Sequence, residues 1–410
     1  MSKLKRAAHS WKECLLYGFI ALILGGVIGV IDAVFGKGLI AISRFRAAHT
    51  GWLLPFLAPA GLMIVWVYTR FGNGAGRGMG LVFAVGHGEE DKIPLRLVPF
   101  VFVSTWLTHL CGGSAGREGV AVQIGATVSH WAARLLAPEA GRIFLIAGMA
   151  AGFSGLFCTP IAATLFALEV LCAGKIYYRA LFPSFVAAFA ASTVSSLLGL
   201  SKFAVSVDLG FDPDAAFFVK LLVLGLIFGL VGRLFSDLLD YTKKLFARRI
   251  PNPYIRVAAV GLCLTALLLF LRGGRYCGLG TNLIEGSFSG EPIYAYDWIL
   301  KLLLTILTLS AGYQGGEVTP QFSIGTSLGA ALAGIFRLPV TLVSALGYAA
   351  VFGSATNTFF APILIGAEVF GFENLPLFFI VCTASYCFGS HRSIYSAQKI
   401  LADDAVGGEE

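Results

Sequence analysis

The sequence predicts an all-α polytopic membrane protein in which two halves repeat one pattern of tilted and broken helices. Hydrophobic residues make up 57% of the 410-residue chain and charged residues only 13%, about half the share of a soluble domain. Fifty glycines accompany apolar bands of unequal length. Several bands are shorter than the roughly 20 residues that cross a bilayer, which is typical of half-helices meeting inside a membrane.

The N-terminal residues predict an uncleaved first span. The basic sequence MSKLKRAAHSWKE precedes an apolar run that begins near Cys14 and passes Val34. That run is too long for the apolar region of a signal peptide, and no small-residue cleavage site is obvious. Positive charges before a span indicate a cytoplasmic N-terminus.

Two sequence blocks of the first half recur in the second half. The block 111–127 aligns with 311–327 at an offset of 200 residues, and the block 148–171 aligns with 347–370 at an offset of 199. The second alignment places Glu169 on Glu368, and we expect a structural role for this matched pair. Two blocks in the same order at nearly the same offset indicate an internal repeat.

The basic residues indicate that the two repeats are inverted. A basic cluster precedes the first span of the first half, whereas Lys243, Lys244, Arg248 and Arg249 follow the first span of the second half. If both clusters are cytoplasmic, the halves have opposite topology, with a site near mid-membrane. We expect a cytoplasmic N-terminal segment (1–13), a first membrane repeat (14–200), a connector (201–214), a second membrane repeat (215–396) and a short cytoplasmic tail (397–410).

The stretch GSAGREG (113–119) is a glycine-rich break before an apolar helix. Free N–H groups at a helix start attract anions, and Glu118 lies where an anion would lie. We therefore expect Gly116 and Glu118 to belong to an anion site, where a charged carboxylate competes with the anion and leaves when it is protonated. The alternative is a carboxylate that stabilises the helix dipole or pairs with Arg117.

The matching stretch GGEVTP (315–320) repeats this design in the second half. Its glycines let the backbone approach an ion closely, and Pro320 suits the first turn of a helix. Glu317 lies where donors converge, and the Thr319 hydroxyl can donate to an anion. The alternative is a surface turn with a capping acid.

A third glycine-rich stretch, FGNGAGRGMGLVF (71–83), places Met79 between two glycines. A similar stretch at 276–286 in the second half predicts a third backbone contribution to one central site, and a flexible loop is the alternative.

Eight scattered cysteines without a CxxC motif and six histidines without ligand spacing predict neither metal nor cofactor. No basic patch is interleaved with aromatic residues, so lipid is the expected surrounding and nucleic acid is not.

The order of these motifs resembles the CLC family of chloride channels and anion/proton antiporters. GREG (116–119), LFCTPIAATLFALE (156–169), GGEVTP (315–320) and the late Tyr395 carry the resemblance, which covers about 14–396. It implies a CLC-like inverted repeat and a homodimer with one anion pathway per subunit. It also implies a transporter rather than an enzyme.

At three places the sequence departs from the usual motifs of that family, and there it resembles the fluoride-exporting branch. Met79 stands where the usual motif has a serine, and Glu317 with Val318 fills the variable part of GGEVTP. Val170 follows Glu169 where chloride antiporters carry a second, inner acid. Fluoride is small and strongly hydrated, so stripping its water requires several short, strong donors.

The resemblance therefore implies a fluoride/proton antiporter that exports cytoplasmic fluoride across the cell membrane, the plasma membrane of a bacterium. Glu118 is the implied proton-operated outer gate, and Glu317 with Thr319 forms the central fluoride site. The other implied anion-site residues are Met79, Gly116, Val318 and Tyr395.

Alternatives from the same and other classes remain open at this point. A chloride/proton antiporter or a passive anion channel would share the fold. The GFSG sequence around Ser154 fits the motif of intramembrane serine proteases, which also need a base such as His109 or His130 within reach. A structural membrane scaffold would carry no ion flux.

Overall fold

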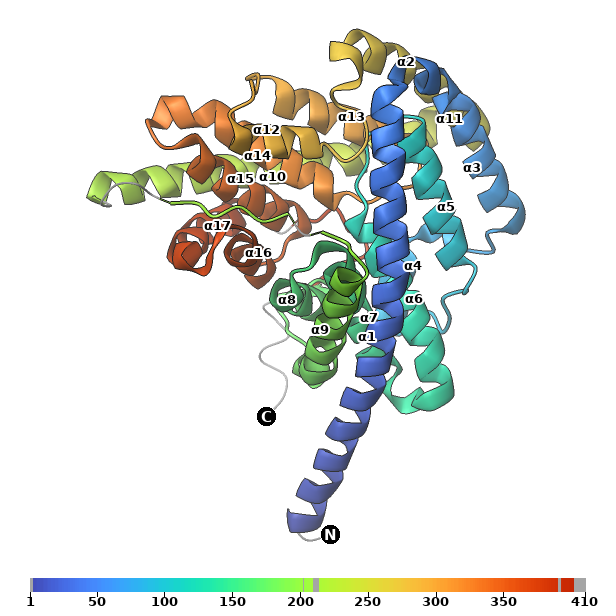
Figure 1. The fold of residues 1–410 in the computed structure, drawn as a ribbon. Coiled ribbons are helices and arrows are strands. Elements are labelled where there is room, and N and C mark those ends of the chain that lie inside the picture. The colour runs from blue at the N-terminus through green and yellow to red at the C-terminus, as the bar shows by residue number, and fades with distance from the viewer. Residues whose placement is uncertain (1–2, 202, 209–213, 390–391, 402–410) are drawn as a thin grey trace.

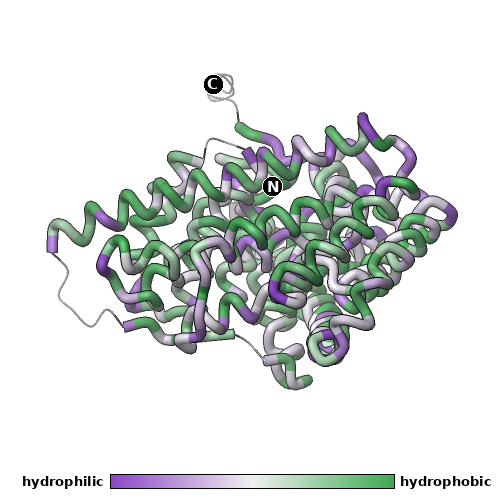
Figure 2. The backbone as a smooth tube through the Cα atoms, turned by 90° about the horizontal axis from the view of Figure 1, so that it is seen from above, coloured by the Kyte–Doolittle hydropathy of each residue, from purple (hydrophilic) through white to green (hydrophobic). Residues whose placement is uncertain are grey.

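The computed structural model describes residues 3–201, 203–208, 214–389 and 392–401 (Figure 1). Residues 1–2 of the expected N-terminal segment, 202 and 209–213 of the connector and 402–410 of the tail lie outside the described residues. Within the described part, seven helices are long and apolar enough to cross a membrane. Hydrophobic residues cover most of the helices, and hydrophilic residues gather near helix ends (Figure 2).

The first half of the chain is helical throughout, apart from short connections. Its α-helices are α1 (Lys3–Ala48), α2 (Thr50–Leu53), α3 (Leu57–Phe71), α4 (Met79–Gly86), α5 (Leu97–Leu110), α6 (Glu118–Leu136), α7 (Gly141–Phe157), α8 (Pro160–Glu169) and α9 (Leu181–Leu197). Single 3-10 turns are η1 (Leu54–Phe56), η2 (Ala75–Arg77), η3 (Pro138–Ala140) and η4 (Tyr178–Ala180).

The second half presents a similar series of helices. These are α10 (Ala215–Arg249), α11 (Pro253–Phe270), α12 (Thr281–Ser289), α13 (Asp297–Ala311), α14 (Val318–Phe336), α15 (Val340–Thr356), α16 (Phe360–Phe370) and α17 (Leu375–Gly389). The 3-10 turns η5 (Arg272–Gly274) and η6 (Phe372–Asn374) lie between them. Strands β1 (Cys172–Ala173) and β2 (Lys399–Ile400) pair in parallel.

Helix α1 is longer than the sequence predicts. It begins at Lys3 instead of near Cys14, and it continues for 46 residues. The reason is local, because neither glycine nor proline interrupts residues 3–17. At 1.5 Å per residue the helix spans roughly 70 Å, more than the thickness of a bilayer. In Figure 1 it stands upright while α10 runs across the view.

The stretch LFCTPIAATLFALE breaks one apolar band into α7 and α8. Cys158 adopts a left-handed conformation with φ of 57°, which ends α7. Pro160 then occupies the first turn of α8, where its missing N–H costs nothing. The apolar band is therefore divided into α7 and the shorter α8.

Glycine pairs join matching helices in both halves. A Cβ on Gly125 of α6 would overlap the carbonyl oxygen of Gly148 in α7, and a Cβ on Gly325 of α14 would overlap that of Gly347 in α15. These are the positions that the two sequence alignments place on one another. The same close approach of helices is thus built twice, which supports the internal repeat.

Helices α8 and α16 lie side by side (Figure 1), and each carries a glutamate, Glu169 or Glu368, that caps the start of the other helix. Glu169, at the end of α8, accepts hydrogen bonds of 3.1, 3.1 and 2.8 Å from the first backbone N–H groups of α16 (Phe359, Phe360 and Ala361). Glu368 of α16 accepts bonds of 3.1 and 2.8 Å from the first N–H groups of α8 (Ile161 and Ala162). The geometry gives both acids a structural role, as their matched positions predict.

Replacing Glu169 by alanine is expected to lower the stability of the protein. The change removes the acceptor of three backbone N–H groups at the start of α16, of which that of Ala361 is buried. Loss of bonds to a charged group costs about 1.5–3 kcal/mol. Thermal unfolding in detergent measures the effect. Glu139→Ala, which removes an exposed acid, is the matched control. Equal unfolding midpoints of the two variants would contradict the capping role.

Candidate functional site

The two glycine-rich breaks meet at the interface of the repeats. Gly116 N–H donates to the Gly316 carbonyl oxygen at 2.6 Å, and Gly316 N–H donates to that of Gly116 at 2.8 Å. This antiparallel bridge brings the starts of α6 and α14 together. The Gly116 N–H is occupied by that bond, so in this conformation Gly116 holds the loops together instead of offering a donor to an anion.

Glu118 lies at this junction with its side chain completely buried. Its Oε2 accepts a hydrogen bond of 3.1 Å from the backbone N–H of Thr319 and a second one from the Thr319 hydroxyl. Its Oε1 lies 3.5 Å from Nε of Arg117. The Glu118 carboxylate therefore occupies the donors at the start of α14 that a bound anion would use.

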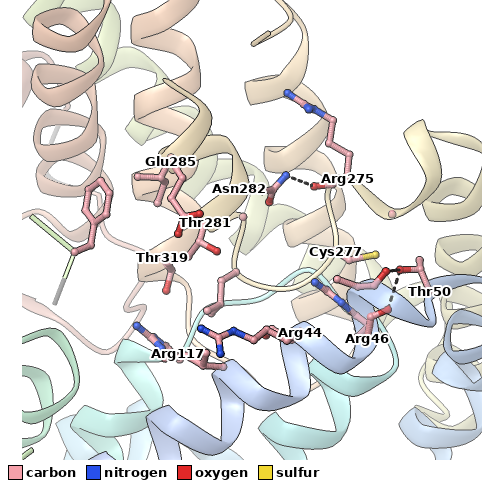
Figure 3. A pocket seen from close by; sticks show the side chains of 18 of the residues that line it. Arg44, Arg46, Thr50, Arg117, Arg275, Cys277, Thr281, Asn282, Glu285 and Thr319 are labelled. Atoms are coloured by element: carbon pink, nitrogen blue, oxygen red, sulfur yellow. Dashed lines mark hydrogen bonds between the residues drawn. The ribbon is translucent and has the colours of Figure 1, made fainter. Parts of the chain in front are cut away.

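A cavity of about 890 Å³ opens on one side of Glu118. We call it the arginine-lined cavity because five arginines line it, together with Glu118, Thr319 and Glu285 (Arg44, Arg46, Arg117, Arg272 and Arg275). In Figure 3 the side chains of Arg44, Arg46 and Arg117 approach the cavity from one side and Thr319 from the other. This cavity connects Glu118 with the end of α1 that is far from the N-terminus.

A second cavity of about 290 Å³, the Tyr395 cavity, is lined by Met79, Glu317 and Tyr395. The carboxylate of Glu317 lies 3.9 Å from Nζ of Lys243, near the end of α10. The Tyr395 hydroxyl is buried and makes no hydrogen bond within the described part of the chain. It is therefore a free donor beside a titratable acid.

The structure distributes the predicted site residues between these two cavities. Glu118 and Thr319 face the arginine-lined cavity, whereas Met79, Glu317 and Tyr395 face the Tyr395 cavity. Val318 is completely buried at the start of α14, between Glu317 and Thr319. The residues of the expected single site are thus divided between two cavities, with Glu118 lining one and Glu317 the other.

The third glycine-rich stretch and its echo serve opposite compartments. Gly78 precedes α4 with φ of 52° and lines the Tyr395 cavity. Gly280 precedes α12 with φ of 84° and lines the arginine-lined cavity. Left-handed φ values favour glycine, which explains why both breaks carry it. Each repeat therefore contributes one short helix start to one compartment.

Tyr395 reaches its place through contacts that are remote in sequence. Ile394 N–H donates to the Ala355 carbonyl oxygen at 2.9 Å. The Gln398 side chain donates to the carbonyl oxygens of Val170 and Thr356, at 2.9 and 3.1 Å. Pairing of β2 with β1 then ties the segment to the loop after α8.

Sequence reasoning missed several residues that line the two cavities. Arg44 and Arg46 belong to the last turns of α1, which was expected to end earlier. Lys243 and Gln123 line the Tyr395 cavity together with Met79, but the sequence placed Lys243 only in a basic cluster. The local signal for Gln123 was a polar residue within the apolar run VAVQIG.

In the structure, Ser154 of the GFSG motif makes a contact between helices. The Ser154 hydroxyl donates to the Ala188 carbonyl oxygen at 2.8 Å. Both ring nitrogens of His109 contact backbone carbonyl oxygens: Nδ1 lies 2.8 Å from that of Thr105, and Nε2 lies 3.0 Å from that of Ala115. His130 contacts the carbonyl oxygen of Asp91 at 3.2 Å. A serine nucleophile requires a base within hydrogen-bond reach, and these contacts leave Ser154 as a helix-packing residue.

Comparison with known proteins places the chain among anion transporters. Residues 60–390 match the sequence model of the family described as voltage gated chloride channel. The "chloride/fluoride channel protein" of Pseudomonas syringae pv. tomato is 35% identical over 397 residues, which cover 95% of this chain and 86% of that protein. The "H(+)/Cl(-) exchange transporter ClcA" of Yersinia pseudotuberculosis is 28% identical and covers 78% of this chain and 71% of that protein.

Solved structures show the same architecture. A crystal structure of a CLC-type fluoride/proton antiporter is 51% identical, with a TM-score of 0.93 over 98% of this chain and 100% of that one. A slow cyanobacterial Cl⁻/H⁺ antiporter matches at 19% identity with a TM-score of 0.81 over 93% of this chain and 96% of that one. The second likeness concerns the fold alone.

Proposed function

This chain belongs to the voltage-gated chloride channel family, the CLC family, and from that membership we propose that it is a fluoride/proton antiporter that exports cytoplasmic fluoride. The observation that carries the proposal is the bond between the Glu118 carboxylate and Thr319. It puts a titratable acid on the donors that a transported anion needs. The likeness to a fluoride/proton antiporter across nearly the whole chain supports fluoride as the anion.

The distribution of basic residues supports an orientation. Lys243, Lys244, Arg248 and Arg249 lie in the last turns of α10, and Lys243 lines the Tyr395 cavity. With these residues on the cytoplasmic side, the Tyr395 cavity opens inward and the arginine-lined cavity opens outward. The bacterial relatives support the plasma membrane as the location.

Exchange follows from competition for the Thr319 donors. A fluoride ion and the Glu118 carboxylate are both anions, and the N–H and O–H of Thr319 serve only one of them at a time. Fluoride that arrives from the Tyr395 cavity displaces Glu118, which takes up a proton from the arginine-lined cavity. When fluoride leaves outward, the carboxylate returns to Thr319 and its proton is released toward the cytoplasm.

The inner compartment suits a small, strongly hydrated anion. The free hydroxyl of Tyr395 and a protonated Glu317 are two O–H donors on one cavity wall. Both can donate an O–H hydrogen bond to an anion, whereas a methionine or an alkyl side chain cannot. Val170, where chloride antiporters carry a second acid, is completely buried. Glu317 is therefore the acid that relays protons on the inner side.

Each subunit of the proposed homodimer contains its own pathway. The helices that line the two cavities are α1, α2, α4, α6, α7, α10, α12, α13, α14 and α15, together with the turns η2 and η5. None of the lining residues belongs to α8, α16 or α17. A dimer that joins through those helices leaves both cavities open.

Ion flux from liposomes tests the proposed function. Purified protein is reconstituted with fluoride or chloride inside, and efflux is recorded with ion-selective electrodes while internal pH is followed against an opposing proton gradient. Fluoride efflux that drives protons uphill, with little chloride efflux, is the expected result. Comparable chloride flux would assign the protein to general anion exchange, and flux without proton movement would make it a channel.

Thr319→Val is expected to weaken fluoride transport by about five-fold, because it removes one hydrogen-bond donor worth about 1 kcal/mol. The substitution preserves the shape of the side chain and leaves the backbone N–H in place. Thr326→Val on the same helix is the control, because its buried hydroxyl donates only to the Phe322 carbonyl oxygen, at 2.7 Å. Equal concentration dependence of fluoride efflux in the two variants would exclude Thr319 from the anion site.

A further inference from the structure

We propose that the arginine-lined cavity contains a separate binding site for oxyanions from the outer solution, formed by Arg46 and Arg117. This site lies between Glu118 and the solvent, and it differs from the Thr319 donors in both residues and chemistry. The proposal does not depend on which ion the protein transports.

Cations exceed acids among the residues that line this cavity. Five of its lining residues are arginines and two are glutamates. Two of the arginines already have partners within the fold. Arg275 donates to the Asp297 carboxylate at 2.7 Å, and Arg272 donates to the hydroxyls of Tyr294 and Tyr296 at 3.1 and 2.8 Å. Arg44, Arg46 and Arg117 remain to face the cavity.

Arg46 has buried donors that nothing in the described chain accepts. Its Nε and one terminal nitrogen, Nη1, are shielded from solvent and make no hydrogen bond. Gly278 packs directly against this guanidinium, because a Cβ there would lie only 2.7 Å from Nη1. Arg46 therefore lines the cavity with a guanidinium whose two shielded nitrogens have no acceptor among the described residues.

Arg117 shows the same feature on the same side of the cavity, next to Glu118. Its side chain is only 13% exposed, and its Nε and Nη1 make no hydrogen bond to any described residue. The nearest acid, Glu118, lies 3.5 Å away and directs its better-placed oxygen at Thr319. Figure 3 shows Arg44 between Arg117 and Arg46, so the three side chains form one cationic wall.

A buried lysine holds the backbone behind the cavity wall. Lys301 of α13 is completely buried, and its Nζ donates to the carbonyl oxygens of Gly278 and Tyr276, at 2.6 and 3.2 Å. Its third bond, of 2.9 Å, goes to the hydroxyl of Ser114. These bonds fix the backbone of Gly278, the residue that packs against the Arg46 guanidinium.

The chemistry of the donors selects the class of ligand. Guanidinium groups are planar and weakly hydrated, and they present paired N–H donors that match the spacing of two oxygens in an oxyanion. A cavity of about 890 Å³ is far too wide to enclose a bare fluoride ion. A planar or tetrahedral oxyanion such as nitrate or phosphate is therefore favoured over fluoride and chloride.

Calorimetric titration of the purified protein with sodium nitrate, inorganic phosphate and sodium chloride at constant ionic strength tests the proposal. We expect saturable binding of at least one of the two oxyanions, tighter than that of chloride, and a loss of about ten-fold or more in affinity in Arg46→Gln. Arg142→Gln, which removes an exposed arginine outside the cavity, is the control and should bind like the original protein. Equal affinity in Arg46→Gln, or no preference for an oxyanion over chloride, overturns the proposal.

Arg46→Lys keeps the test decisive if the glutamine variant does not fold. Lysine retains the charge but loses the paired donors, so the preference of oxyanion over chloride should shrink while the protein stays folded. An unchanged preference would contradict bidentate binding by Arg46. Because these titrations measure binding without transport, they remain informative even if the flux experiment were to reject fluoride export.

Discussion

Glu118→Gln is expected to abolish proton movement driven by a fluoride gradient. Glutamine has nearly the shape of the protonated glutamate and can still bond to Thr319, but it neither carries a charge nor releases a proton. The competition between carboxylate and fluoride for the donors of Thr319 is then lost. Internal pH recorded in liposomes under a fluoride gradient measures the effect.

Glu139→Gln is the matched control for this experiment. It is the same substitution at an exposed acid just beyond the other end of α6, and it should leave coupled exchange unchanged. Unchanged fluoride-driven proton movement in Glu118→Gln would remove Glu118 from the proton path. Proton movement lost in both variants would point to damage of the fold instead of loss of the gate.

Glu317→Ala is expected to reduce fluoride transport more than any other single change in the Tyr395 cavity. Loss of a hydrogen bond involving a charged or strongly polar group corresponds to about 1.5–3 kcal/mol, or roughly 10- to 100-fold in rate. The substitution also leaves the Lys243 ammonium, now 3.9 Å from the Glu317 carboxylate, without that acid. Initial rates of fluoride efflux from liposomes give the magnitude.

Glu317→Gln separates the two functions assigned to this acid. The amide retains a donor for fluoride but carries no titratable proton, so fluoride efflux should fall less than in the alanine variant while proton coupling is lost. A glutamine variant that couples protons normally would show that Glu317 binds the anion without relaying protons. Equal efflux in the alanine variant and the original protein would exclude it from the anion path.

Local sequence signals located the helix breaks beside the candidate site, because such signals act within a single helical turn. Glycines and an acid at Glu118, and again at Glu317, mark breaks before apolar helices, and both breaks occur at helix starts in the structure. The same reasoning underestimated α1, since apolar patterning reports where a helix lies in lipid and not where it ends in water. Arg44 and Arg46 were missed for that reason.

Contacts between the repeats were beyond the reach of the sequence. The aligned blocks predicted that two breaks are equivalent, yet they did not predict that Glu118 accepts its bonds from Thr319, 201 residues away. Nor did they predict that Glu169 and Glu368 each accept hydrogen bonds from the start of the helix that carries the other. Such pairings depend on how the two halves pack, and the free energy of that packing is spread over many helices.

The sequence by itself determined a membrane-embedded helical repeat, the positions of its broken helices and the acids beside them. Composition decides burial in lipid, and glycine, proline and charge decide where a helix starts, because these effects need only neighbouring residues. Only the tertiary structure decided which cavity each residue faces. It placed Glu118 with Arg117 and Thr319 on one side and Glu317 with Tyr395 on the other, since that choice follows from the contact between two repeats about 200 residues apart.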